Sequence, residues 1–365
     1  MLFLHSGAFK PQAPKSLFMC AERVLSGTIL SGEQFEPREG RVISENGVIT
    51  AIEETPVESD AIILPAFVNA HTHIGDSIAK EAGEGLSLTE LVAPPDGLKH
   101  RLLRAATQDE LIAAMGRTLR YMEQAGTGAF IEFREGGVDG VSAIREALAG
   151  RAITPVILGR ETVAAMEAAD GFGASGANDA EFEREREATR AAGKLFGIHA
   201  GEVDSSDIHP ALDLRPDFLV HMVHAAADHL ERVAAQDVPV VVCPRSNAAT
   251  NVGLPPVEEL ADHTTVALGT DNVMLNSPSM FREMAFLSNL SDLPAAEILR
   301  MATVHGAAIA GLNCGVIEPG TESRLLVLDG ESDNLTGVRD PVRAVVRRAS
   351  VSDVAQVVFP ESVSQ

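Results

Sequence analysis

The feature that most constrains the fold is a regular alternation of strand-like and helix-like segments between residues 62 and 310. Short runs rich in Val, Ile, Leu and Phe are followed by longer segments rich in Ala, Glu, Arg and Leu. The predicted strands are 62–68, 128–133, 153–158, 171–175, 196–199, 218–221, 238–243 and 265–268. The predicted helices are 109–125, 141–149, 180–194, 226–236, 256–261, 279–290 and 295–310. This order predicts an α/β fold, a (β/α)8 barrel of the TIM type.

The segments on either side of this region look different, with short alternating runs separated by turns. They lie at 21–25, 40–44 and 48–53 before the barrel, and at 323–328, 342–347 and 354–359 after it. Residues 45–47, Glu-Asn-Gly, are typical of a tight hairpin turn. We therefore predict a small β-sandwich domain built from residues 1–61 and 316–365, flanking a barrel over 62–315.

Charge and hydropathy limit the kinds of partner. The chain has 365 residues, of which 45% are hydrophobic, and a formal net charge of −23. Such a surface repels phosphate backbones and anionic lipids, so we expect neither nucleic acid nor a membrane as a partner. No apolar run approaches the roughly 20 residues of a membrane span. The first residues lack the basic segment of a signal peptide, so a cytoplasmic location is expected.

Metal-binding and acid–base side chains follow several predicted strands, at the end where barrel enzymes carry their active sites. His71 and His73 follow the first strand, and residues i and i+2 of a strand point to the same face. The candidates at the other strand ends are His199, Glu202, His221 and Asp271. Each comes directly at or shortly after an apolar run, so we expect these side chains to meet at the mouth of the barrel.

Three imidazoles and a carboxylate suit a divalent ion such as zinc or iron(II). Three or four protein ligands leave room for a water, whose pKa the ion lowers towards about 7. Glu202 can take a proton from that water and pass it to a leaving group. His221 can hydrogen-bond the attacking oxygen or polarise the substrate. His224 competes for this role, but His221 is favoured because it ends the apolar run.

Five motifs in order carry a resemblance to a known family. They are His-Thr-His at 71–73 after PAFVNA, HAGE at 199–202, LVH at 219–221, CPRSN at 243–247 and LGTDN at 268–272. Together they resemble the amidohydrolase superfamily, and most closely its cytosine deaminase-like and chlorohydrolase-like branch. That branch includes guanine and S-adenosylhomocysteine deaminases. The resemblance covers nearly the whole chain, since a small terminal sheet domain is also typical of the family.

The resemblance implies a metal-dependent hydrolase with a mononuclear centre. His71, His73, His199 and Asp271 would be ligands of one divalent ion, for which zinc is favoured over iron(II). His221 and Asp271 would surround the attacking water, and Glu202 would shuttle its proton. Ser246, Asn247 and Glu132 are the candidate substrate-side residues. The implied reaction is hydrolytic deamination of an amino-substituted heterocycle, a purine, pyrimidine or related base or nucleoside.

Two observations favour a single metal ion and a deamination reaction within this branch. Binuclear members bridge their metals with a lysine or glutamate on the fourth strand, and no lysine lies between Lys99 and Lys194. Dechlorinating members often lack the glutamate that is Glu202 here. Hydrolysis of a cyclic amide or another leaving group by the same site remains an alternative. A catalytically inactive barrel that acts as a binding protein is the alternative of another class.

Several details stay open. Glu132 ends the second strand, where a salt-bridged rim is as good an interpretation as a substrate contact. Residues 94–101, which include Lys99, match no motif, and a solvated turn is favoured over contact with an anionic substrate. Arg245 is bulkier than the branch leads us to expect. A homodimer is left open, because dimers are common in such families although no residue here points to one.

Overall fold

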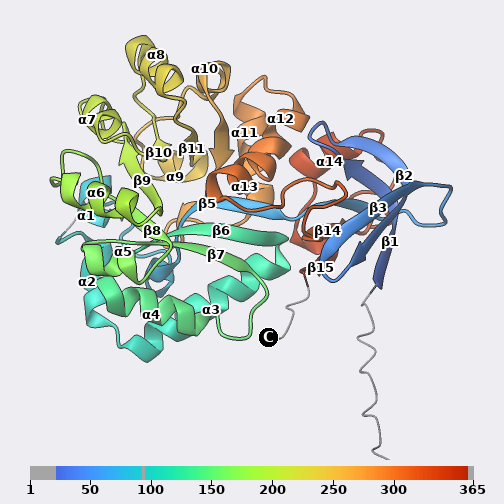
Figure 1. Cartoon of the computed structure of the whole chain (residues 1–365), viewed down its shortest axis with the longest axis horizontal. Coiled ribbons are helices and arrows are strands. Elements are labelled where there is room, and N and C mark those ends of the chain that lie inside the picture. Colours follow the sequence, from blue (N-terminus) through green and yellow to red (C-terminus); the bar gives the residue numbers. More distant parts are fainter. Residues whose placement is uncertain (1–21, 93–94, 361–365) are drawn as a thin grey trace, which may run out of the picture.

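A ladder of parallel strands forms the body of the molecule in the computed structural model, which describes residues 22–92 and 95–360 (Figure 1). The strands are β5 (Phe67–His73), β6 (Thr127–Arg134), β7 (Thr154–Gly159), β8 (Gly171–Ala174), β9 (Leu195–Ala200), β10 (Phe218–His221), β11 (Val240–Val242), β12 (Val266–Leu268) and β13 (Asp271–Asn272). Only Gly269 and Thr270 separate β12 from β13. β12 pairs with β11 and β13 pairs with β5, so the two halves of the eighth strand close the barrel. The predicted (β/α)8 architecture is confirmed, including its short fourth strand.

Helices lie outside this ladder. They are α3 (Gln108–Gln124), α4 (Gly137–Ala147), α5 (Val163–Glu167), α6 (Glu183–Ala191), α7 (Ile208–Asp213), α8 (Ala227–Gln236), α9 (Pro244–Ala249), α10 (Val257–His263), α11 (Met280–Leu290), α12 (Ala295–Met301) and α13 (Val304–Ala310). Helix α3 shows why they form. Thr107 and Glu110 make a capping box at its start, and Met115, Leu119 and Met122 are fully buried along one face.

A long connection between β5 and α3 covers part of the barrel mouth. It contains the 3-10 helix η1 (Ile74–Ala79), α1 (Leu88–Val92) and α2 (Leu98–Ala105). In a barrel of this kind, the connections that follow the strands carry the active site. The position of this segment therefore bears directly on function.

A second sheet beside the barrel contains strands from both ends of the chain (Figure 1). Its order is β15 (Val354–Val358), β14 (Leu325–Leu328), β4 (Ile62–Pro65), β1 (Glu22–Ser31), β2 (Glu36–Glu45) and β3 (Val48–Glu54). Asn46 and Gly47 have φ values of 51° and 80°, the left-handed conformations that the predicted hairpin turn requires. The small domain from both termini is confirmed, and its described strands form one hydrogen-bonded sheet. Ala21, the predicted start of the first strand, lies outside the described residues.

Two local predictions differ from the structure. Strand β4 pairs with β1 and β14, so residues 62–65 belong to the small sheet, and we propose Ala66 rather than residue 62 as the start of the barrel. Residues 342–347 form part of a helix, α14 (Pro341–Arg347), and not a strand. Asp340 caps this helix by accepting a hydrogen bond from the backbone of Arg343, and proline is well suited to a first helical position.

Within the part of the chain that the structure describes, no helix combines the length and apolar composition needed to cross a bilayer.

Candidate metal centre and active site

The four predicted metal ligands come together at the carboxyl ends of the barrel strands. His71 and His73 end β5, His199 lies near the end of β9, and Asp271 begins β13. Oδ1 of Asp271 lies 3.3 Å from Nε2 of His71 and 3.6 Å from Nε2 of His73. Nε2 of His73 lies 3.4 Å from Nε2 of His199. Side chains separated by up to 200 positions in sequence therefore share one small volume.

The hydrogen bonds of two histidines direct their lone pairs at each other. Nδ1 of His73 lies 2.8 Å from Oε1 of Glu135, and Nδ1 of His199 lies 2.7 Å from the carbonyl oxygen of Ala174. A carbonyl oxygen and an ionised carboxylate only accept, so both Nδ1 atoms carry the hydrogen. Both Nε2 atoms then present lone pairs at 3.4 Å, an arrangement that a shared cation stabilises.

His71 gives a second indication that these residues fit a metal ion. It is fully buried, and neither of its ring nitrogens has a hydrogen-bond partner. Buried polar atoms in proteins are normally paired, so an unpaired imidazole beside Asp271 points to a ligand. Three nitrogen donors and one carboxylate oxygen match the preferences of zinc and iron(II).

Electrostatics keep the donors in the protonation states that metal binding requires. Burial lowers the pKa of His71 and His199, and burial together with the Lys99 ammonium lowers the pKa of His73 to about 3. Burial opposes ionisation of Asp271, but the imidazoles beside it, above all His71 at 3.3 Å, hold the pKa of its carboxyl well below the usual range. The centre therefore holds neutral imidazoles and an ionised carboxylate at neutral pH.

The predicted acid–base residues lie beside these ligands. Nε2 of His221 is 3.6 Å from Oε2 of Glu202, and the two side chains share a space with Asp271. Burial raises the pKa of Glu202, which favours a carboxyl group that holds and releases a proton. The Glu202 side chain is 18% exposed, so it can meet a substrate. His224, the competing histidine, is solvent-exposed.

The backbone is strained at two of these residues. His221 has a φ of 80° and Asp271 a φ of 57°, both in the left-handed region that side chains other than Gly rarely adopt. Such conformations cost on the order of 1–3 kcal/mol each and persist where the surrounding structure enforces them. These backbone conformations orient the side chains of His221 and Asp271 differently from the way a regular strand would.

Ser246 and Asn247 are buried and contact two side chains of the centre. The Ser246 hydroxyl donates to Oδ2 of Asp271 at 2.5 Å, and the side-chain nitrogen of Asn247 lies 3.1 Å from Nδ1 of His221. Ser246 is 1% exposed and Asn247 is fully buried. The substrate-binding role of these two residues stays a prediction, and their contacts hold the orientations of Asp271 and His221.

Glu132 is also held by hydrogen bonds inside the protein. It is fully buried, and its carboxylate accepts hydrogen bonds from the backbone of Ile74, at 3.0 and 2.8 Å, and from the Thr72 hydroxyl at 2.7 Å. These bonds hold the turn that follows His73. The substrate contact of Glu132 stays a prediction, and the hydrogen bonds give the residue a structural role.

The burial of the Glu132 carboxyl group predicts a pH-dependent contribution to the stability of the fold. Burial raises the pKa of Glu132 to about 7, above its value of about 4.5 in the unfolded chain, so the folded state holds the proton more tightly. The resulting stability is complete below pH 4.5 and is lost as pH rises through 7. Relative to Glu132→Gln, which does not titrate, the wild-type free energy of unfolding should fall by about 3 kcal/mol from pH 4.5 to 8. Urea unfolding of both proteins across this range measures it, and a constant difference would contradict it.

The structure also corrects the interpretation of Lys99 and explains Arg245. Lys99 is 2% exposed, and its Nζ lies 2.6 Å from Oε1 of Glu135, so it is no solvated turn residue. Arg245 pairs with the fully buried Glu283, at 3.3 Å, and donates to Asn276 at 3.0 Å. Sequence offered one weak signal for Lys99, since lysine occurs at only five positions of the chain.

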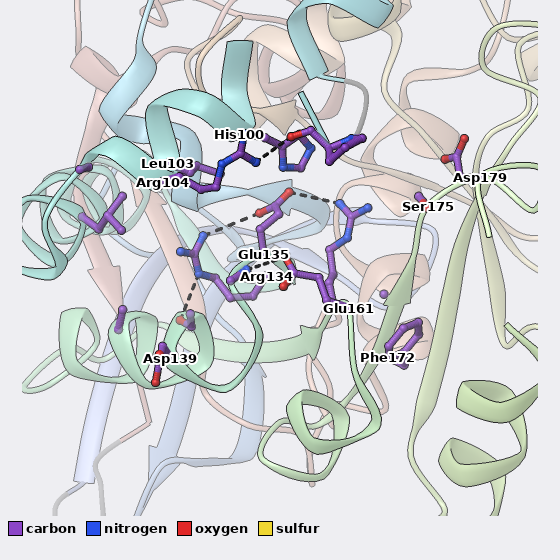
Figure 2. A pocket seen from close by; sticks show the side chains of 18 of the residues that line it. His100, Leu103, Arg104, Arg134, Glu135, Asp139, Glu161, Phe172, Ser175 and Asp179 are labelled. Atoms are coloured by element: carbon purple, nitrogen blue, oxygen red, sulfur yellow. Dashed lines mark hydrogen bonds and ion pairs between the residues drawn. The ribbon is translucent and has the colours of Figure 1, made fainter. Parts of the chain in front are cut away.

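A cavity of about 810 Å³ lies next to the centre, within the size range of small-molecule sites. Figure 2 shows His100, Leu103 and Arg104 of α2 along one side of it, with Arg134 and Glu135 from the end of β6 below them. The remaining labelled lining comes from the segments after β6, β7 and β8 and from β8 itself: Asp139, Glu161, Phe172, Ser175 and Asp179. Glu135 connects the cavity with the centre, because it lines the cavity and hydrogen-bonds His73.

Comparison with known proteins identifies relatives over nearly the full length. A relative in Methanothermobacter thermautotrophicus, named provisionally as an aminohydrolase, is 33% identical over 380 residues, covering 92% of this chain and 97% of its own. The 5-methylthioadenosine/S-adenosylhomocysteine deaminase of Halobacterium salinarum is 28% identical, covering 92% of this chain and 90% of its own. A zinc-bound adenosine deaminase from Xanthomonas campestris shares the fold, with a TM-score of 0.76 at 18% identity over 92% of this chain and 91% of that one.

The family model for amidohydrolases matches residues 62–235 and 215–359. Most of the barrel and most of the second half of the small domain fall inside these segments. The match includes all four predicted ligand residues as well as Glu202 and His221. On this coverage, and on the 33% identity to a full-length relative, the chain belongs to the amidohydrolase family.

Proposed function

We propose that this protein hydrolytically deaminates an amino-substituted heterocycle, a purine, pyrimidine or related base or nucleoside, and releases ammonia. The observation that carries the proposal is the convergence of His71, His73, His199 and Asp271 beside an acid–base pair, Glu202 and His221. The relatives named as deaminases support the same class of reaction.

We propose one metal ion per chain, with zinc favoured and iron(II) as the alternative. The donor set of three imidazoles and a carboxylate supports zinc. Strand β8 reads Gly-Phe-Gly-Ala, so the fourth strand of the barrel carries no lysine or glutamate that could bridge a second ion. His71, His73, His199 and Asp271 would hold the ion, which supplies the acidity that makes water a nucleophile near neutral pH.

The protein's own residues account for the proton transfers. Asp271 and His221 would orient the attacking water, and their side chains lie within 4.8 Å of the Glu202 carboxylate, a spacing that one water can bridge. The water oxygen bonds to the ring carbon that bears the amine, and Glu202 delivers a proton first to the ring nitrogen. Glu202 takes that first proton from the attacking water, and it then moves the remaining hydroxyl proton of the same water to the amine. The carbon–nitrogen bond breaks as the carbonyl bond forms, and the amine leaves as ammonia.

A panel of heterocycles tests the reaction and the substrate together. Purified protein with zinc should release ammonia from at least one aminopurine, aminopyrimidine, aminopterin or the corresponding nucleosides, measured with a coupled ammonia assay. Protein treated with a chelator should lose this activity and regain it with added zinc. Ring opening of a cyclic amide without ammonia release would favour the alternative hydrolase. Stoichiometric binding of a heterocycle without turnover would favour a binding protein.

A further inference from the structure

Helix α2 is attached to the barrel through a buried charge. Of its eight residues only Lys99 is buried, whereas Leu98 and Leu102 pack half-buried against a small apolar cluster. Lysine is rarely buried in proteins unless it is paired, because removing an ammonium group from water is costly. The position of this lysine therefore calls for a specific partner.

Lys99 reaches two partners, and each of them holds a metal-ligand residue. Its Nζ lies 2.6 Å from Oε1 of Glu135 and donates to Oδ1 of Asn272 at 3.1 Å. Oε1 of Glu135 also accepts from Nδ1 of His73 at 2.8 Å. The side-chain nitrogen of Asn272 donates to Oδ1 of Asp271 at 3.0 Å. One ammonium group thus connects His73 and Asp271 through a single intervening side chain on each path.

Glu135 stays ionised for reasons that do not depend on Lys99 alone. Burial opposes its ionisation, but Lys99, His73 and Arg160 together hold the pKa of its carboxyl well below the usual range. Nη1 of Arg160 lies 3.2 Å from the carboxylate, and Nη1 of Arg134 lies 3.7 Å from it. If Lys99 lost its charge, two guanidinium groups would still face Glu135. A substitution of Lys99 therefore tests how Lys99 positions Glu135, more than whether the Glu135 carboxylate stays ionised.

The same helix forms a wall of the cavity beside the centre. His100, Leu103 and Arg104 follow Lys99 on α2 and line the cavity, and Glu135 lies across from them (Figure 2). Lys99 is the point at which this wall meets the residues that hold the metal ligands. Its loss would free the wall and loosen His73 and Asp271 together.

We propose that Lys99 is a positioning residue that fastens the α2 wall of the cavity to His73 and Asp271, so that the placement of the wall and the order of the metal ligands depend on each other. The inference rests on the proposed function, because it assumes that these residues bind a metal ion and that the cavity receives the substrate.

Lys99→Met tests the proposal, since methionine keeps most of the apolar stem and removes the ammonium group. Zinc affinity should fall about 10–100-fold in a chelator competition assay, as expected when a residue that orients a metal ligand is lost. Amide hydrogen exchange should become faster across Leu98–Ala105. Lys80→Met is the matched control, because Lys80 is an exposed lysine of the same connection, and its zinc affinity should stay within about 2-fold of wild type.

Two results would overturn the proposal: zinc affinity of Lys99→Met within 2-fold of wild type, or unchanged exchange in α2. A lysine needed only for folding would lower the melting temperature of the metal-free protein and leave the zinc affinity unchanged. Should Lys99→Met not fold, Lys99→Gln keeps a hydrogen-bond donor and should still weaken zinc binding, by less than Lys99→Met; wild-type affinity in that variant would also overturn the proposal.

The outcomes separate this inference from the proposed function. If wild-type protein releases no ammonia from any heterocycle and Lys99→Met still loses zinc affinity, the deaminase proposal fails and the role of Lys99 stands. If wild-type protein deaminates and Lys99→Met binds zinc normally, the role of Lys99 fails and the deaminase proposal stands.

Discussion

Glu202→Gln is expected to lower turnover by about 10²–10⁴-fold and to leave the metal content unchanged. Glutamine has nearly the same size and keeps an oxygen near His221, but it cannot carry the proton that passes from the attacking water to the leaving amine. Glu202 is not among the four residues that would bind the ion, so zinc affinity should persist. The measurement is kcat for ammonia release, together with zinc per chain by elemental analysis.

Asp204→Asn provides the matched control for this change. Asp204 is an exposed acid two residues further along the same loop, and it accepts a hydrogen bond from the backbone of Ser206 at 2.8 Å. Its loss removes one negative charge near the site without touching the proposed shuttle, so kcat should change little. If Glu202→Gln kept kcat within about 10-fold of wild type, another group would have to carry the proton.

His71→Ala should abolish metal binding and activity together. His71 is fully buried, neither ring nitrogen is otherwise paired, and Asp271 lies 3.3 Å from its Nε2. Loss of a direct ligand should weaken zinc binding by more than the roughly 100-fold that residues behind a ligand contribute. Zinc per chain after dialysis should fall far below one equivalent, and ammonia release should fall with it.

His263→Ala controls for the loss of a histidine as such. His263 is exposed at the end of α10, where its Nδ1 lies 2.7 Å from the carbonyl oxygen of Glu259. This variant should keep both zinc and turnover. A His71→Ala protein that bound one equivalent of zinc with wild-type affinity would remove the basis of the proposed centre.

Much of the barrel could be predicted from sequence because its signals are local. Apolar runs marked the strands, and the ends of those strands carried His71, His73, His199 and Asp271. Parallel strands of a barrel present these ends on one face, so convergence followed from the order of the elements. The Asn46-Gly47 turn was predictable for the same reason. The positive φ angles that the turn requires are adopted by these two adjacent residues, which favour them.

The contacts that depend on distant partners could not be predicted. Lys99 resembles a surface lysine until Glu135, 36 positions away, is brought beside it. The contacts of Ser246 with Asp271 and of Asn247 with His221 join residues 25 and 26 positions apart, which no local pattern indicates. The 342–347 segment was ambiguous because Val342, Val345 and Val346 fit either a strand or one buried face of a short helix.

If the proposed centre binds a metal ion, the joint between β12 and β13 would link metal binding to closure of the barrel. A Cβ atom on Gly269 would lie 2.7 Å from Cβ of His71 and 2.9 Å from its backbone nitrogen, so the segment between β12 and β13 packs directly on His71. Asp271, the other end of this joint, emerges late when the chain is synthesised from its amino terminus. A nascent chain can offer its histidines early, but it completes the donor set only when the final strand docks. If these residues bind zinc as proposed, the ion would favour the closed barrel over intermediates that offer only part of the donor set.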